Sequence, residues 1–166
     1  MIVTEGALIQ ASGSIGGGTI HIGGEQEGRG LLQRARVVLV DENSEIRADA
    51  IRQGDGGTVI AFAEDLTSID GEISARGGRE GGDGGFVETS GLRNFRISRT
   101  PDLSAPLGVG GSWLIDPFNI TVSNTAPDCP LEGDGCLNKS IEAILSPNFD
   151  PVGFDGILRT VDPAEN

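Results

Sequence analysis

Aromatic side chains are scarce in this chain, which excludes several common architectures. They make up 4% of the 166 residues, with no tyrosine and one tryptophan, while glycine occurs 27 times. A glycine inside a helix costs about 1 kcal/mol relative to alanine, so a helical bundle is disfavoured. The apolar residues are mainly Ile, Leu, Val and Ala, which pack well on a pleated surface. This composition favours an all-β fold.

Positive charge is also scarce, and this bears on the partners. The chain has 12 basic and 25 acidic residues, for a formal net charge of −13. Such a surface repels nucleic-acid phosphates and anionic lipid headgroups, so we expect no nucleic-acid partner. The acidity is better explained by the solubility of an extended exposed surface than by a dedicated cation-binding role.

No hydrophobic run approaches the roughly 20 residues that a membrane-spanning helix needs, so we do not expect the chain to cross a membrane. Residues 1–10 lack the basic start and apolar centre of a secretion signal. The two cysteines, Cys129 and Cys136, lie close together in a loop rich in Pro, Gly and Asp. They could form a local disulfide in an oxidising compartment, which is weak evidence for export.

Two families of short segments alternate in fixed order along the chain. In the first family, a Gly-Gly pair starts a short strand; its copies begin at Gly17, Gly56, Gly84 and Gly110. The second family has a large apolar residue two positions before alanine, and its copies are Ile9-Gln10-Ala11, Ile46-Arg47-Ala48, Ile73-Ser74-Ala75 and Leu103-Ser104-Ala105. Internal repeats of this length are typical of solenoids.

Aligning the copies gives columns of similar residues, because strand residues two apart share a face. The predicted inward columns are Ile20, Val59, Val87 and Trp113; Ile22, Ala61, Thr89 and Ile115; Ile9, Ile46, Ile73 and Leu103; and Ala11, Ala48, Ala75 and Ala105. The intervening residues, including His21, Ile60, Glu88 and Leu114, are predicted to point outward. A narrow core between stacked coils requires such repeated columns.

A third strand fits between the families, at 37–40, 67–69 and 95–97. Three strands per repeat predict a parallel β-helix of about three to four coils over residues 1–122. The step from Gly57 to Gly85 is 28 residues and that from Gly85 to Gly111 is 26, whereas the step from Gly18 to Gly57 is 39. We assign the excess to an outward loop near Glu25–Arg36.

Residues 123–166 form a second region, an irregular C-terminal extension. The pattern ends after Asp116-Pro117, although 118–122 could form one more strand. A short helix is predicted to start at Ser140, whose hydroxyl can cap its free amides, and to stop before Pro147. The tail from Asn148 shows little periodicity and is expected to be partly disordered.

The repeats resemble those of a known family. The residues that carry the resemblance are Gly-Gly-Gly-Thr-Ile-His-Ile-Gly-Gly at 16–24, Gly-Asp-Gly-Gly-Thr-Val-Ile-Ala-Phe-Ala at 54–63, the run from Ile73 to Gly91, and Trp-Leu-Ile-Asp-Pro-Phe-Asn-Ile-Thr-Val at 113–122. They look like the large filamentous-haemagglutinin-like exoproteins of Gram-negative bacteria and cyanobacteria. The resemblance covers roughly Ile9 to Val122 and, more weakly, 140–145.

This resemblance implies a function. Members of the family form right-handed β-helices, are exported by two-partner secretion through a dedicated outer-membrane transporter barrel, and act at the cell surface as adhesins or carry toxins. The amino-terminal secretion domain of the family is not recognisable here, so the chain is expected to be an internal or downstream fragment. A host or neighbouring-cell surface receptor is the expected partner.

Motifs that could carry chemistry have simpler structural explanations. Asp55 and Asp83 lie in Gly-Asp-Gly-Gly runs. They are one whole repeat apart, which does not match the short period of calcium-binding nonapeptide repeats, so turn formation is favoured. The single histidine, His21, has no partners for a catalytic triad or a zinc site. We therefore predict no catalytic, cofactor-binding or metal-binding residues and no cofactor.

A carbohydrate-active β-helix enzyme is the main alternative. Glu45, Glu72 and Asp102 align just before the inward Ile/Leu column, and stacked carboxylates about 5 Å apart could shift a pKa or hold a cation. A solvated acidic stripe is the favoured explanation, because no basic or aromatic sugar-stacking residues are expected to converge on these carboxylates. The outward Ile60 and Leu114 could form a small apolar patch.

The sequence thus predicts a structural, presentational segment of a secreted or cell-surface adhesin and not an enzyme. Contacts are expected from outward side chains and from the loops Glu25–Arg36 and Gly77–Gly85. A non-functional fragment of a larger exoprotein, with exposed coil ends that promote aggregation, remains a further alternative.

Overall fold

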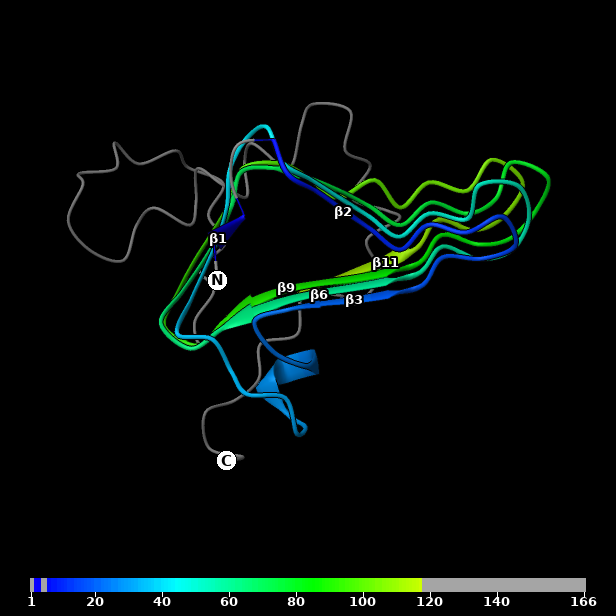
Figure 1. Ribbon diagram of the computed structural model, residues 1–166. Helices are drawn as coiled ribbons and strands as arrows, with labels where there is room; N and C mark the ends of the chain where they lie inside the picture. Colours follow the sequence, from blue (N-terminus) through cyan, green and yellow to red (C-terminus); the bar gives the residue numbers. More distant parts are fainter. Residues whose placement is uncertain (1, 4–5, 118–166) are drawn as a thin grey trace, which may run out of the picture.

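The computed structural model describes residues 2–3 and 6–117, which form three parallel sheets (Figure 1). The first sheet contains β1 (Ile2–Val3), β4 (Val37–Val40), β7 (Leu66–Ile69) and β10 (Asn94–Ile97). The second contains β2 (Leu8–Gln10), β5 (Glu45–Arg47) and β8 (Glu72–Ser74). The third contains β3 (Thr19–Ile22), β6 (Thr58–Ala63), β9 (Phe86–Gly91) and β11 (Ser112–Pro117).

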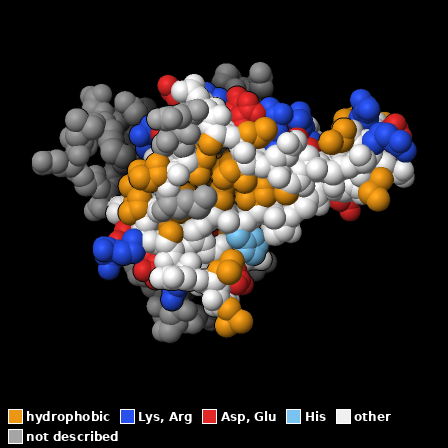
Figure 2. Space-filling view, viewed as in Figure 1, with side chains coloured by type: hydrophobic (Ala, Val, Ile, Leu, Met, Phe, Trp, Pro, Cys, Tyr) orange, Lys and Arg blue, Asp and Glu red, His pale blue; other side chains and the backbone are white. Residues whose placement is uncertain are grey.

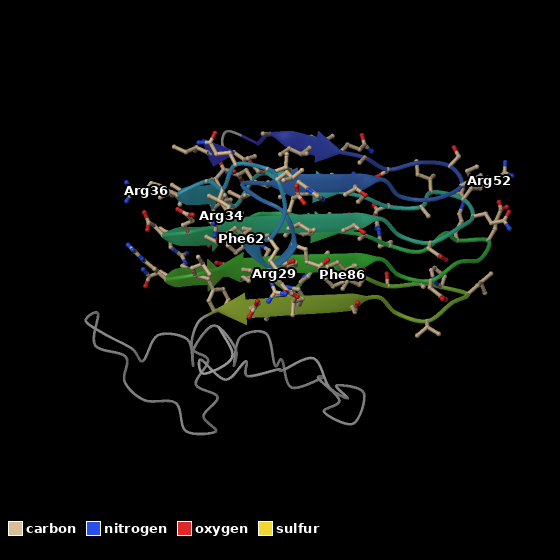
Figure 3. All side chains as sticks on the ribbon, turned by 90° about the horizontal axis from the view of Figure 1, so that it is seen from below. Arg29, Arg34, Arg36, Arg52, Phe62 and Phe86 are labelled. Atoms are coloured by element: carbon tan, nitrogen blue, oxygen red, sulfur yellow. The ribbon has the colours of Figure 1, made fainter. Side chains whose placement is uncertain are left out.

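The chain visits the three sheets in the same order each time. We call one such pass a circuit; the four circuits begin at β1, β4, β7 and β10. In the fourth circuit, a single parallel bridge from Asp102 to Ser74 replaces the strand of the second sheet. Figure 3 shows the circuits layered over one another from the side. The predicted all-β class, parallel pairing and third strand are confirmed over the described residues.

The register of the third sheet matches the predicted columns. Ile20 pairs with Val59, Val59 with Val87, and Val87 with Trp113. The next inward column, Ile22, Ala61, Thr89 and Ile115, pairs in the same way. These side chains are buried apart from the half-buried Ile115. The polar groups of two of them meet across adjacent circuits, since the Trp113 indole donates a hydrogen bond to Thr89 Oγ1 at 2.8 Å.

Leu103 does not join the column of large residues in the second sheet. Ile9, Ile46 and Ile73 pair as predicted. The backbone of the fourth circuit, however, is shifted by two residues from the predicted alignment. Asp102 donates its N–H to Ile73 and accepts one from Ala75, which places Leu103 beside Ala75. The prediction that aligned Leu103 with Ile73, and Ala105 with Ala75, was therefore wrong. The prediction aligned Leu-x-Ala with Ile-x-Ala by residue type. The backbone instead keeps the same spacing between circuits that relates β10 to β7.

The Gly-Gly pairs exist because neighbouring circuits approach too closely for a side chain. A Cβ on Gly57 would lie 2.0 Å from the carbonyl oxygen of Gly18, and one on Gly85 would lie 2.0 Å from that of Gly57. Gly111 repeats this relation with Gly85. None of these three glycines has a positive φ. Close backbone approach, more than turn formation, therefore requires glycine at these positions.

Residues 23–36 form a segment that we call the strap. It leaves the stack between β3 and β4, as the long step from Gly18 to Gly57 predicted, but it folds back over the outer face of the third sheet. Its single helical turn, η1 (Gln26–Gly28), contacts β6. Gly28, with φ of 65°, lies so close to Phe62 that a Cβ would be 2.2 Å from Phe62 Cζ. Figure 3 shows Phe62 beneath this segment.

The strap buries three side chains at outward positions of the third sheet. Ile60, Phe62 and Glu88 have exposed fractions of 4%, 1% and 0%. The prediction that Ile60 and Glu88 face solvent was wrong because the insertion covers this part of the outer face. His21 is exposed as predicted, and Leu114 is half-buried.

Several expectations fall on residues that the structure does not describe. Cys129 and Cys136, the strand expected at 118–122, and the helix and tail of the second region, 123–166, all lie outside the described residues. Within the described part of the chain, no helix is both long enough and apolar enough to span a membrane.

Removing a large inward side chain should destabilise the whole stack. Ile46 is fully buried between Ile9 and Ile73. Ile46→Ala should therefore lower the free energy of unfolding by about 2–5 kcal/mol. The matched control is Ile15→Ala, because the Ile15 side chain is 81% exposed. This control should change the free energy of unfolding by less than about 0.5 kcal/mol. Urea denaturation followed by circular dichroism measures both; equal losses would contradict the assigned core.

Candidate binding surface

A polar depression lies on the outer face of the second sheet. It has a volume of about 210 Å³ and is lined by Arg47, Glu72, Ile73, Ser74, Arg76, Arg99, Thr100 and Asp102. A second depression of about 330 Å³ adjoins it and shares Arg76 and Asp102. Outward side chains of three successive circuits meet here because the strands pair in register. Arginines and carboxylates alternate across the surface.

Asp49 and Arg76 form the centre of this surface. The Asp49 side chain is 8% exposed and receives hydrogen bonds from Arg76 Nη2 at 2.8 Å, from the Arg76 backbone N–H at 2.8 Å and from Ser74 Oγ at 3.1 Å. Burial acts to raise the pKa of Asp49, but the hydrogen bonds from Arg76 and Ser74 outweigh it and hold this pKa below its usual value. Arg76 thereby ties the third circuit to the second.

The predicted acidic column is present in part. Glu45 and Glu72 are direct register partners in β5 and β8. Asp102 is not the third member of this column, because it pairs with Ser74. Ser74 is the register partner of Arg47, so Asp102 belongs to the column of Arg47 and not to that of Glu72. The two-residue offset that moved Leu103 also moves Asp102.

Each of these three carboxylates has an arginine partner. Glu45 forms an ion pair with Arg47, and Glu72 forms one with Arg99 at 2.8 Å. Asp102 lies 3.8 Å from Arg76. The expectation that no basic residue converges on these carboxylates was therefore wrong, because the arginines come from neighbouring circuits or from two residues along the strand. Their presence turns a stack of like charges into a charge-compensated surface, which can offer hydrogen-bond donors and acceptors to a polar ligand.

The aspartates of the glycine-rich runs serve the backbone. Asp55 Oδ1 accepts the N–H of Asp83 at 2.8 Å, and Asp83 Oδ1 accepts the N–H of Val109 at 2.8 Å. Each carboxylate thus holds the next circuit in place, which gives the predicted turn role a specific geometry. Over residues 2–3 and 6–117, no group of three or more His, Cys, Asp or Glu side chains could hold a metal ion.

The corner between the second and third sheets projects from the described part of the chain. It consists of 11–18, 48–57, 75–85 and 103–111, and so contains the predicted loop Gly77–Gly85. Figure 1 shows these segments lying over one another and projecting from the body. Four aliphatic side chains on it are at least half exposed: Ile15, Ile51, Leu107 and Val109. Figure 2 shows hydrophobic and charged side chains together at its tip.

Comparison of the chain with protein-family models and with curated proteins finds no match.

The ion pair of Asp49 should stabilise the stack in a pH-dependent way. Asp49→Asn should lower the free energy of unfolding by about 1–3 kcal/mol at neutral pH, because Asn keeps one acceptor oxygen but loses the negative charge, and its NH2 group cannot accept hydrogen bonds from Arg76 or Ser74. The folded-state pKa of Asp49 is lowered. Its contribution is therefore complete above about pH 4 and disappears as the pH falls through that lowered pKa.

Urea denaturation of the native protein and of the Asp49→Asn variant between about pH 3 and about pH 7 measures the difference in their free energies of unfolding. Asp102→Asn is the matched control, since that side chain is half exposed and more distant from Arg76. It should change stability by less than about 0.5 kcal/mol. A difference for Asp49→Asn that persists unchanged in acid would contradict the assignment.

Proposed function

We propose that the four circuits form a right-handed parallel β-helix, and that this helix is part of the shaft of a secreted or cell-surface adhesin of the filamentous-haemagglutinin type. The observation that carries the proposal is the parallel, in-register pairing of all three sheets in one repeated order. Each circuit contacts its neighbours through inward columns, so the interior is filled by packing. Contact with other molecules would then fall to the outer surface.

The family resemblance supplies the cellular setting of this proposal. The repeats at 16–24, 54–63, 73–91 and 113–122 carry it. By that resemblance, the full protein would pass through an outer-membrane transporter barrel and reach the bacterial surface. A shaft would hold the adhesive residues away from the cell, where a host or neighbouring-cell receptor could meet them.

The projecting corner is the part of the described surface that best suits adhesive contact. Ile15 and Val109 lie in the first and fourth circuits and are 81% and 73% exposed. Isolated exposed aliphatic residues are common on proteins, but here they recur on one stacked feature. The strap, the other predicted contact loop, packs over Phe62 around η1, and its exposed aliphatic residues are the adjacent Leu31 and Leu32 of a single circuit.

The carbohydrate-active alternative has weaker support. Acid catalysis by paired carboxylates requires one carboxyl to be free to protonate the substrate. Glu45, Glu72 and Asp102 each have an arginine partner instead. The outer face of the second sheet is therefore better suited to holding the circuits together than to cleaving a glycosidic bond.

Disulfide cross-linking tests the proposed stacking. Gln10 and Arg47 are register partners in adjacent circuits. Their Cα atoms should lie about 5 Å apart, within the range of a disulfide. In a background with Cys129 and Cys136 changed to serine, Gln10→Cys with Arg47→Cys should oxidise readily.

The matched control for this experiment is Gln10→Cys with Ser74→Cys. Ser74 is the partner of Arg47 in the following circuit, so this pair is separated by two strand spacings. Its Cα atoms should be about 10 Å apart, which is too far for a disulfide. Cross-linking of the control pair alone would rule out the proposed stack.

An adhesion assay tests the functional part. Beads coated with the chain should bind cell monolayers, and a variant with serine at Ile15, Ile51, Leu107 and Val109 should lose most of this binding without a change in melting temperature. The control carries serine at Leu31 and Leu32, exposed aliphatic residues of the strap, and should keep it. Release of reducing sugar from a pectin panel, or equal adhesion by all three proteins, would contradict the proposal.

A further inference from the structure

A carboxyl group is buried on the outer face of the third sheet, beneath the strap. Glu88 is 0% exposed, and its Oε1 accepts the backbone N–H of Glu27 at 2.8 Å. Its other oxygen, Oε2, is buried without a hydrogen-bond partner, as is Ser90 Oγ two residues along the same strand. A buried charged group without full hydrogen bonding is strongly disfavoured. Glu88 therefore has reason to be neutral while the strap covers it.

The charged groups around Glu88 are mainly acidic. The strap contributes Glu27 and Arg29, which form an ion pair with each other at 3.3 Å. Asp116 of β11 lies near both strap residues. β6 presents the uncharged Ile60 and Phe62, and His21 of β3 is separated from Glu88 by Ile60 in the same column. No arginine or lysine in the described part of the chain forms an ion pair with Glu88.

These surroundings change the acidity of Glu88. Burial is the largest cause and raises its pKa, and the neighbouring Glu27 and Asp116 carboxylates raise it further. The hydrogen bond from the Glu27 N–H opposes this rise in pKa without cancelling it. Burial and Glu27 likewise raise the pKa of Asp116, which Arg29 partly offsets. Loss of the proton from Glu88 thus adds a third negative charge close to the carboxylates of Glu27 and Asp116.

The part of the strap that covers Glu88 is held to the sheet by few interactions. Glu25 closes the strap on itself, since its Oε1 accepts the N–H groups of Leu31 and Leu32 at 3.1 and 3.0 Å. Around η1, the contact with the sheet is glycine backbone over the Phe62 ring together with the Glu27–Glu88 hydrogen bond. The returning end is tied more firmly, because Ala35 O accepts the backbone N–H of Glu64 at 2.9 Å and Arg36 O accepts that of Asp65 at 2.8 Å. A segment anchored in this way can open around η1 without unfolding the stack.

We propose that the strap is a pH-sensitive cover: protonated Glu88 keeps it closed over Ile60 and Phe62, and ionisation of Glu88 opens it and exposes these two apolar side chains. In the open state water reaches Glu88, which lets its carboxyl regain ordinary acidity. Closure is therefore favoured at low pH. It weakens as the pH rises through the raised pKa that Glu88 has in the closed state. Each pKa unit of that rise changes the closed-to-open ratio about tenfold.

Two measurements between about pH 4 and about pH 9 test this cover. The first is the hydrogen-exchange protection factor of the Glu27 amide, corrected for the intrinsic rate at each pH. The second is fluorescence of a dye that binds exposed apolar surface. In the native sequence, protection should fall and dye binding should rise as the pH increases. The melting temperature at each pH shows that the stack stays folded.

Three variants make the test specific. Glu88→Gln keeps an oxygen for the Glu27 N–H and carries no charge, so its protection and dye binding should be independent of pH. Gly28→Val cannot fit over Phe62 and should bind the dye at every pH. Glu80→Gln, at the distant corner, is the control and should behave as the native sequence does.

The outcomes separate clearly. A pH-dependent loss of Glu27 protection in the native sequence and in Glu80→Gln, absent in Glu88→Gln, supports the proposal. Protection that is constant with pH in the native sequence overturns it, as does the same pH dependence in Glu88→Gln. If Gly28→Val fails to fold, the comparison of the native sequence with Glu88→Gln still decides.

Discussion

The structure depends on one constraint, the in-register stacking of parallel circuits. Because each residue lies directly against its counterpart in the next circuit, every position must tolerate a copy of itself about 5 Å away. Val59 on Val87 satisfies this by apolar packing, and Gly57 on Gly85 by having no side chain at all. Asp55 satisfies it differently, by accepting the N–H of Asp83. The three solutions explain the columns, the Gly-Gly pairs and the Gly-Asp runs together.

The same constraint shows why the surface needs its arginines. In a chain with net charge −13, stacking would place acid on acid at many outer positions. Arginines from adjacent circuits interrupt this: Asp65 lies between Arg36 and Arg93, and Arg76 lies between Asp49 and Asp102. Single exposed ion pairs contribute little to the free energy of unfolding. Separating like charges in adjacent circuits nevertheless favours the observed register over shifted registers. The arginines therefore act chiefly on register.

The sequence predicts the structural features that recur in each circuit. It does not predict features that occur in a single circuit. Val59 and Ile46 could be assigned to the core because four copies of each segment align. Leu103 was placed wrongly because the copies were aligned by residue type alone. The spacing that relates β10 to β7 also holds for the backbone at Asp102 and would have placed Leu103 correctly. The cover over Glu88 had no periodic signal at all. The available hint was local: Ile60 and Phe62 are apolar at two outward positions of one circuit, and a glycine-rich insertion precedes that circuit.

The separation of interior from surface also bears on function. Since each circuit contacts only its neighbours, a change at Ile15 or Leu107 on the corner leaves the inward columns untouched. A change at the buried Glu88 does not share this freedom, because the strap and the third sheet both contact it. The corner can therefore vary in sequence without disturbing the core, whereas Glu88 and the strap constrain each other. In the proposed shaft, this division would allow variable contacts at the corner and conditional exposure of Ile60 and Phe62 on the outer face of the third sheet.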